Sequence, residues 1–426
     1  MEFIRPRGTR DFLFDEMANR KKVENILREV FENYAYEEVK TPIFENLTLF
    51  TNKSGDEIVK QLYNFKDKSS RELALRPEIT APIVRLYLNS LQKSLKPIKL
   101  YYFGSCFRYE RPQKGRFRQF WQFGCELIGA KSPQGEAEII AMAYDSLKKL
   151  SVDAEIHINH LGIIRGLFNH FKINEELQEQ IMILIDKGDK QLLEDGINDL
   201  LKDNETFQEI ILKLFDSVGN ENVLDDIKKY LKDYDNVKES LNEFKKLTEL
   251  LTIFGVDNYK INLSVARGLD YYTKIVFEIY VSELKTQKQI CGGGTYNLIK
   301  AFGGEDIQST GFAFGFDRLM VAIKDLKSSS NLQVLVAPVS ENTRLKSYEI
   351  AQTLRRENIK TETDLVNRKF KKILSFANSL NVSKVILVGE KDLKEGKVTV
   401  KDMVSGNQEF IPIEDIVNYI KENIDD

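Results

Sequence analysis

Residues 97–129 have the sequence PIKLYYFGSCFRYERPQKGRFRQFWQFGCELIG. Two runs of this segment, 97–108 and 118–129, are rich in aromatic and β-prone residues, and a polar, basic loop separates them. These features predict a long antiparallel hairpin.

The second run of the hairpin has two different faces, because side chains along a strand alternate with a period of two. One face carries Arg118, Phe120, Gln122 and Glu126, and the other carries Trp121, Phe123, Cys125 and Leu127. The second face is typical of a core. The first face, beside the arginines of the loop, suits a ligand with an aromatic base, an ammonium group and phosphates. Any one of these residues alone is better explained as part of a solvated edge, but the combination favours a site.

The remaining chain alternates between helical and extended patterns. Apolar residues at helical spacing predict an amphipathic helix over 18–33, and the segment from Glu78 to Leu91 also has a helical pattern. Residues 271–282 are strand-like, and STGFAFGFDRLMVAIKDL at 309–326 predicts a strand that runs into a helix. The sequence between these blocks is helix-forming and acidic, so we expect the first and third blocks to share one sheet.

These patterns predict a domain organisation. Residues 1–164 and 261–325 are expected to form an α+β core, with residues 165–260 as a helical insertion. LKSSSN at 326–331 has the chemistry of a linker. Beyond it, strands and helices alternate, which predicts a small α/β domain over 332–426 with a largely parallel sheet.

Composition indicates a globular protein of two or three domains, since the chain has 426 residues, of which 42% are hydrophobic and 30% charged. The net charge is −3, so a nucleic-acid partner must be met by a local basic patch. No apolar stretch approaches the roughly 18 residues that span a bilayer, and the first residues are too charged for a signal peptide. Three scattered cysteines suit a reducing compartment. We therefore expect a cytosolic protein without a membrane partner.

Nucleotide-loop and metal motifs are not supported by the sequence. The glycine cluster CGGGTYN at 291–297 lacks the third glycine of a dinucleotide-binding loop, and no GK[ST] follows it. We interpret the cluster as a tight turn that allows close backbone approach, or as a turn that faces a ligand. No metal site is predicted, because His157 and His160 lack a nearby cysteine pair.

Several motifs together resemble the class II aminoacyl-tRNA synthetases, and among them the histidyl-tRNA synthetase family. Residues 107–129 look like motif 2, GFAFGFDRL at 311–319 resembles motif 3, and the region around Pro42 occupies the place of motif 1. VARGLDYYT at 265–273 is similar to the histidine-specific signature of the family, and LRPEIT at 75–80 to a further ligand-binding segment. The resemblance covers nearly the whole chain in the right order.

The resemblance implies a fold and a function. The core would be class II synthetase-like, with a mostly antiparallel sheet, and residues 332–426 would bind the anticodon. The enzyme would activate histidine with ATP and Mg²⁺ to histidyl-adenylate and transfer it to the 3′ end of histidine tRNA. The presence of motif 1 implies a homodimer.

The family pattern also implies roles for single residues. It places on ATP the side chains of Arg108, Arg116, Phe120 and Arg318. It places on histidine Glu78, Thr80, Gln122, Glu126, Tyr271 and Tyr272. The residues expected to be catalytic are Arg108, Arg267 and Arg318, and those expected at the tRNA acceptor end are Arg111 and Gln113.

The chain departs from the family pattern at two places. GGTYNLI at 293–299 stands where GGRYDGL is common, and Asp317 stands where motif 3 usually has glutamate. A second possible function is that of a non-catalytic paralogue, like the regulatory subunit of ATP phosphoribosyltransferase, which binds histidine as a sensor. Such relatives lack the anticodon domain and lose the phosphate-binding arginines, whereas this sequence keeps both. The ligase is therefore favoured.

Overall fold

The computed structural model describes residues 3–51, 59–111, 116–202, 204–266, 272–282, 284, 288–324 and 332–423. Its contacts divide the chain into two compact units, residues 1–12 with 20–326 and residues 13–19 with 327–426. The predicted linker at 326–331 lies outside the described residues. Within the described part of the chain, no helix is both long and apolar enough to cross a membrane.

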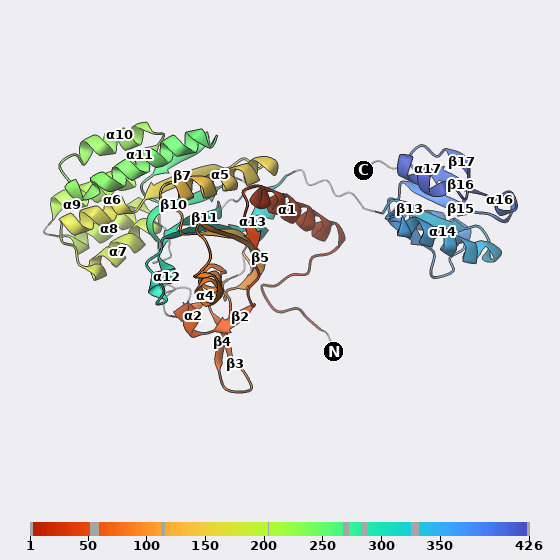
Figure 1. The fold of residues 1–426 in the computed structure, drawn as a ribbon, viewed down its shortest axis with the longest axis horizontal. Coiled ribbons are helices and arrows are strands. Elements are labelled where there is room, and N and C mark those ends of the chain that lie inside the picture. Colours follow the sequence, from red (N-terminus) through yellow and green to blue (C-terminus); the bar gives the residue numbers. More distant parts are fainter. Residues whose placement is uncertain are drawn as a thin grey trace. The chain divides into compact units, whose positions relative to one another are not determined.

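Among the described residues, the larger unit is built on a nine-stranded sheet (Figure 1). In spatial order its strands are β1 (Glu37–Glu38), β5 (Ile98–Phe107), β6 (Gln119–Ile128), β12 (Ser309–Gly315), β11 (Gln289–Tyr296), β10 (Tyr272–Tyr280), β7 (Glu155–His160), β9 (Tyr259–Asn262) and β8 (Val218–Gly219). Neighbours from β5 through to β7 are antiparallel, whereas β1 joins β5 and β9 joins β7 in parallel. The prediction of a mostly antiparallel core sheet shared by the first and third blocks is confirmed.

Strands β5 and β6 form the predicted hairpin, with a register that runs from Ile98 opposite Ile128 to Phe107 opposite Gln119. The two faces of β6 are also confirmed. Phe123, Cys125 and Leu127 are buried in the main core and Trp121 packs against it, whereas Phe120 packs against a second apolar cluster. The strand therefore separates the core from a face that is free to carry a site.

Helix α1 (Phe14–Asn33) lies on the core side of the sheet together with α5 (Gln134–Lys149) (Figure 1). The prediction of an amphipathic helix over 18–33 is confirmed. The side chains that α1 buries recur at helical spacing, and they include Val23, Leu27, Val30 and Phe31. These side chains share one core with α5 and with the inward face of β6.

The other face of the sheet is covered by α4 (Thr80–Leu86) and α12 (Leu298–Ala301) (Figure 1). Helix α4 continues into a π-helical turn, Tyr87–Leu91, so the helix predicted from Glu78 is confirmed from Thr80 onward. A small sheet precedes it in sequence, with the order β2 (Phe44–Asn46), β4 (Glu72–Leu75) and β3 (Tyr63–Lys66), and α2 (Thr48–Thr51) follows β2. The start of α4 lies on the polar side of β6, because Ile79 and Ile83 belong to the apolar cluster against which Phe120 packs.

The helical insertion consists, in its described part, of α6 (Gly162–His170), α7 (Glu175–Asp186), α8 (Lys190–Leu200), α9 (Glu205–Phe215), α10 (Asn222–Tyr230), a 3-10 turn at Asp235–Val237 and α11 (Lys238–Ile253). Side chains of Asn174, Asp189 and Asn204 accept the backbone N–H groups that α7, α8 and α9 leave free at their starts. The helical character predicted for this segment is confirmed, although the short strand β8 also lies within it.

The prediction of a turn at the glycine cluster is wrong. Residues 289–296 form strand β11, which pairs with β10 on one side and β12 on the other. Close backbone approach explains the glycines: a Cβ on Gly293 would lie 2.4 Å from the carbonyl oxygen of Gly311, and one on Gly294 would lie 2.6 Å from that of Ile275. The cluster is therefore a strand interior that only glycine allows to pack this tightly.

The second unit contains, in its described residues, a five-stranded sheet of order β14 (Thr361–Thr363), β13 (Val334–Pro338), β15 (Lys384–Val388), β16 (Lys397–Asp402) and β17 (Gln408–Pro412). Its helices are α14 (Arg344–Arg356), α15 (Phe370–Ser379), α16 (Glu390–Lys394) and α17 (Ile416–Glu422). The predicted α/β character is confirmed. The sheet is parallel only from β14 to β15, because β16 and β17 form an antiparallel hairpin that the sequence analysis missed.

Candidate active site

Glu126, on β6, lies at the centre of a buried polar cluster. Its side chain is 1% exposed and accepts hydrogen bonds from the hydroxyls of Tyr296 (2.5 Å) and Tyr102 (3.2 Å). Burial raises the pKa of Glu126 to about 8, although the bond from Tyr296 opposes this shift. Gly311 lies opposite on β12, where a Cβ would come within 2.1 Å of Oε2 of Glu126. The buried environment therefore shifts this carboxyl group towards its protonated form.

A second carboxyl group, that of Glu78, lies in the same cluster. It accepts hydrogen bonds from the backbone N–H groups of Thr80 (2.5 Å) and Ala81 (3.1 Å), so the first turn of α4 holds it in place. Burial raises the pKa of Glu78, whereas these bonds and the charge of Arg108 lower it. The Thr80 side chain lowers the pKa of both Glu78 and Glu126, and the charge of Glu78 raises the pKa of Glu126 further. Two buried acids this close together favour a cationic ligand.

Gln122 and Tyr272 complete the described part of the predicted histidine set. Gln122 lies on the same face of β6 as Glu126, and its Oε1 accepts a hydrogen bond from the Cys106 thiol (3.3 Å). Tyr272 begins β10 and is buried in the apolar cluster beneath α4. Its carbonyl accepts a hydrogen bond from Arg165 (2.7 Å). The structure brings these residues to one side of the sheet.

The predicted ATP set lies at the other end of β6. Nε of Arg108 donates to the carbonyl of Pro77 (2.9 Å), and its guanidinium lies 5.3 Å from the ring centre of Phe120. Arg318, on α13 (Phe316–Ala322), donates to the carbonyl of Gln289 (2.8 Å). Both guanidinium groups are therefore held by backbone carbonyls.

The arginines of this set influence each other electrostatically. Burial lowers the pKa of Arg318, and the positive charges of Arg116 and Arg108 lower it further. The negative charge of Glu110, which forms an ion pair with Arg116, raises the pKa of Arg318 and so offsets part of this repulsion. Three guanidinium groups with one carboxylate among them leave an excess of positive charge that suits a polyvalent anion.

Four predicted residues are not part of these clusters as the structure describes them. Gln113, Arg267 and Tyr271 lie outside the described residues, so their placement stays a prediction. Arg111 is described and exposed, at the edge of the hairpin loop.

Sequence reasoning missed Tyr102, Tyr296 and Cys106, which hold the side chains of Glu126 and Gln122. A signal was available for two of them. The period of two in β5 places Tyr102 and Cys106 on the same side of the hairpin as the polar face of β6, since they pair with Gly124 and Phe120. Tyr296 is adjacent to Glu126 only because β11 and β12 follow β6 in the sheet.

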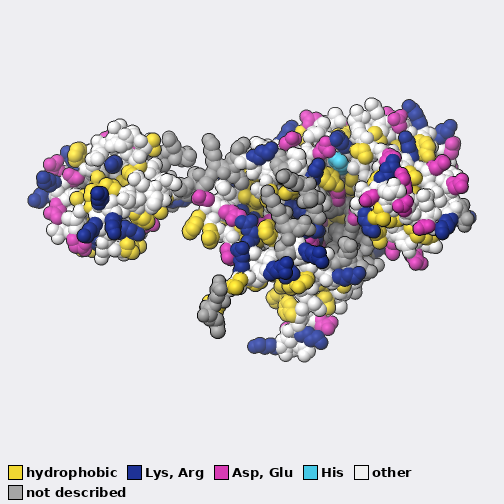
Figure 2. All heavy atoms as spheres, turned by 180° about the vertical axis from the view of Figure 1, so that it is seen from behind, with side chains coloured by type: hydrophobic (Ala, Val, Ile, Leu, Met, Phe, Trp, Pro, Cys, Tyr) yellow, Lys and Arg dark blue, Asp and Glu magenta, His cyan; other side chains and the backbone are white. Residues whose placement is uncertain are grey.

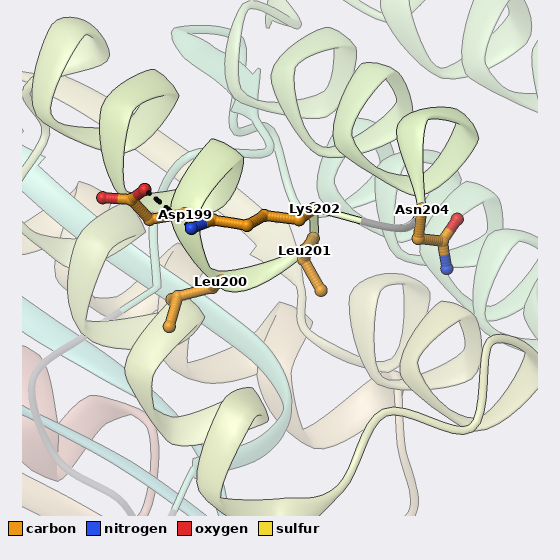
Figure 3. A pocket seen from close by; sticks show the side chains of 5 residues that line it. All are labelled: Asp199, Leu200, Leu201, Lys202 and Asn204. Carbon is orange, nitrogen blue, oxygen red and sulfur yellow. Dashed lines mark ion pairs between the residues drawn. The ribbon is translucent and has the colours of Figure 1, made fainter.

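Two hollows of the larger unit lie away from these clusters. One, of about 460 Å³, is lined by Asp199, Leu200, Leu201, Lys202 and Asn204, where α8 ends (Figure 3). Figure 3 shows the ion pair of Asp199 with Lys202, whose charged atoms are 3.7 Å apart. The other, of about 480 Å³, lies beside Asn222 and Thr252. Of the assigned histidine and ATP residues that the structure describes, none lines either hollow.

Comparison with known proteins supplies the family. The family model described as Histidyl-tRNA synthetase matches residues 8–319, and the one described as Anticodon binding domain matches residues 333–423. A histidine–tRNA ligase of Methanocaldococcus jannaschii is 49% identical, in an alignment that covers 98% of this chain and 99% of the relative. The chain belongs to the histidyl-tRNA synthetase family. It is therefore an aminoacyl-tRNA synthetase that charges tRNA with histidine at the expense of ATP.

Solved structures agree with the assignment of this synthetase to the family. The crystal structure of apo S. aureus histidyl-tRNA synthetase aligns with a TM-score of 0.76 at 29% identity, covering 99% of this chain and 100% of that one. A Bacillus halodurans C protein described as an ATP phosphoribosyltransferase regulatory subunit/histidyl-tRNA synthetase aligns with a TM-score of 0.78 at 25% identity, covering 91% and 98%. That description names both functions considered above. The match to the anticodon-binding model covers the segment that a sensor would lack, so the synthetase is favoured.

Proposed function

We propose that the acid cluster around Glu126 and the arginines around Arg108 are two halves of one site that activates histidine. The carboxylate of histidine attacks the α-phosphorus of ATP, pyrophosphate leaves, and histidyl-adenylate forms. The terminal ribose hydroxyl of tRNA then attacks the adenylate carbonyl, and AMP leaves. A carboxylate is already a nucleophile, so the first step depends on alignment and charge stabilisation rather than on a general base.

One observation carries this proposal, namely that the two halves touch. Arg108 donates to the carbonyl of Pro77, the residue directly before Glu78, and its positive charge lowers the pKa of Glu78. A ligand with an ammonium group near Glu78 would thus present its carboxylate near a guanidinium group. This is the arrangement in which the carboxylate of an amino acid meets the α-phosphate of ATP.

For ATP, we assign Arg108 to the α-phosphate, Arg116 and Arg318 to the β and γ phosphates, and Phe120 to stacking on the adenine. A guanidinium group stays protonated and offers a planar fork that matches phosphate oxygens. The triphosphate would compete with Glu110 for Arg116. Arg267 is assigned to the space between the histidine carboxylate and the α-phosphate.

Mg²⁺ is assigned to the ATP complex rather than to a protein site. The ion prefers oxygen ligands and is commonly held by substrate phosphates with one or two carboxylates. Where the chain is described, no group of three or more His, Cys, Asp or Glu side chains is arranged to hold a metal ion.

For histidine, we assign Glu78, Thr80 and Gln122 to the α-amino group, Glu126 and Tyr272 to the two imidazole nitrogens, and Tyr271 to the pocket wall. An apolar amino acid of similar size could not hydrogen-bond to the buried Glu126 and Tyr272 as an imidazole would. Such a pocket discriminates by a factor on the order of 10⁴.

For tRNA, we assign Arg111 and Gln113 to the acceptor end and the domain at 332–426 to the anticodon. Figure 2 shows Lys and Arg side chains mixed with Asp and Glu on the visible face of both units. RNA binding then depends on a local stripe of basic residues rather than on bulk charge. We further expect a homodimer that acts in the cytosol, with the core at 1–164 and 261–325.

Pyrophosphate exchange into ATP tests the proposal. The purified protein should exchange pyrophosphate only when histidine is supplied, out of a panel of amino acids that includes proline and threonine. Exchange supported by one of the other amino acids, or by none, would refute the assignment.

A further inference from the structure

Arg20 of α1 and Asp317 of α13 form a buried ion pair that has no role in the scheme above. Nη1 of Arg20 lies 2.8 Å from Oδ1 of Asp317, and each residue is 5% exposed. The second carboxylate oxygen, Oδ2, accepts a hydrogen bond from the backbone N–H of Trp121 (2.9 Å). One carboxylate therefore joins α1, β6 and α13, which are far apart in the sequence.

The bond to Trp121 lies where β6 loses its neighbour strand. Strand β12 pairs with β6 from Ser309 opposite Ile128 to Gly315 opposite Gln122, and the chain then turns into α13. Trp121 is the next residue of β6 beyond this pairing. Asp317 thus provides the acceptor that a continuing strand would have provided for the backbone N–H of Trp121.

The guanidinium group of Arg20 is held in one orientation by aromatic rings. Its Cζ lies 3.9 Å from the ring centre of Phe12, 4.8 Å from that of Phe316 and 5.0 Å from that of Trp121. Cation–π contacts of this kind fix a planar cation over ring faces. A buried ion pair adds little net stability compared with apolar residues of the same volume. We therefore look for the role of this pair in the geometry that it fixes rather than in stability.

The neighbours of this pair belong to the proposed ATP site. Phe120 precedes Trp121, and Arg318 follows Asp317. We propose that Arg20 and Asp317 are positioning residues that set the distance between Phe120 and Arg318, and hence between the adenine and the terminal phosphates of bound ATP. This inference rests on the proposed function. It also accounts for the aspartate in this motif 3. A glutamate would place one more methylene group between α13 and the two partners of the carboxylate, Arg20 and the backbone N–H of Trp121.

Steady-state pyrophosphate exchange with the full chain tests the proposal. Asp317→Asn keeps the size of the side chain and an acceptor for Trp121 but removes the charge, and Arg20→Lys keeps the charge but removes the fork. We expect each change to raise the KM for ATP roughly tenfold while the KM for histidine changes by less than about twofold. Arg28→Leu is the matched control, since Arg28 is also an ion-paired arginine of α1 but its partners are Glu24 and Glu38. It should leave both KM values unchanged.

Misfolding is addressed by the double variant Arg20→Leu/Asp317→Asn, which leaves no uncompensated buried charge. It should melt near the wild-type temperature and still show the raised KM for ATP. A wild-type KM for ATP in Asp317→Asn, equal increases in both KM values, or the same ATP effect in Arg28→Leu would overturn the positioning role. In each of these cases the wild type still exchanges pyrophosphate with histidine, whereas a wild type without that exchange would overturn the proposed function and this inference together.

Discussion

The buried carboxyl group of Glu126 couples the stability of the ligand-free protein to pH. Burial raises its pKa from 4.5 to about 8, so between these values the folded protein binds a proton that the unfolded chain has released. The free energy of unfolding therefore falls as the pH rises through this window. Glu126→Gln mimics the protonated form and should remove this dependence. Relative to wild type, the variant should gain on the order of 3 kcal/mol between pH 5 and pH 8 in urea titrations. A difference that does not vary with pH would contradict the assigned protonation.

The same carboxyl group should dominate histidine affinity. Glu126→Ala removes the partner of an imidazole N–H and should weaken binding by roughly 2 kcal/mol or more in calorimetry. Glu136→Gln is the control, because Glu136 is another buried acid but hydrogen-bonds to Thr295 rather than to the cluster. Unchanged affinity in Glu126→Ala would show that the pocket is misassigned.

Arg318 should act on ATP rather than on histidine. Arg318→Lys keeps a positive charge but loses the planar fork that matches phosphate oxygens. We expect kcat/KM for ATP in the exchange reaction to fall roughly 10²-fold. The dissociation constant of histidine, measured without ATP, should stay at the wild-type value. Loss of histidine binding in this variant would show that Arg318 belongs to the histidine half of the site and contradict its assignment to ATP.

At the level of elements, the spacing between β6 and β12 depends on glycine. A Cβ on Gly311 would lie 2.1 Å from Oε2 of Glu126 and 2.5 Å from the carbonyl oxygen of Cys125, so Gly311→Ala must push the two strands apart. We expect lower thermal stability and loss of histidine binding. Gly315→Ala, on the same strand, is the control, because the nearest atoms to its Cβ would be 3.7 Å away. Equal behaviour of the two variants would argue against a steric role for Gly311.

At the level of the whole molecule, the two units have separate hydrophobic cores. Leu335 and Ile373 are buried together in one cluster of the second unit, whose described members all lie at or after residue 332. Leu335→Ala should destabilise that unit by about 2–5 kcal/mol and lower one calorimetric transition. Histidine-dependent pyrophosphate exchange should be unaffected, whereas tRNA charging should fall above the new transition temperature. Loss of exchange in this variant would show that the units depend on each other.

The elements of the fold that could be predicted are those whose information lies in neighbouring residues. The hairpin of β5 and β6 follows from alternation with a period of two, and α1 from apolar residues three and four apart. The turn from β12 into α13 is also local. The prediction of a turn at the glycine cluster is wrong, because the need for glycine there arises from the close carbonyl oxygens of Gly311 and Ile275 on adjacent strands.

The candidate site divides in the same way. Motifs that run along the chain predict its residue types, and they are the basis on which Glu78, Glu126, Arg108 and Arg318 are assigned to the site. Their partners could not be predicted, because the contact of Tyr296 with Glu126 or of Asp317 with Arg20 requires a strand order and a helix packing that no local period encodes. The raised pKa of Glu126 has the same origin. Desolvation depends on every segment that folds over a side chain, and those segments become neighbours only in the assembled sheet.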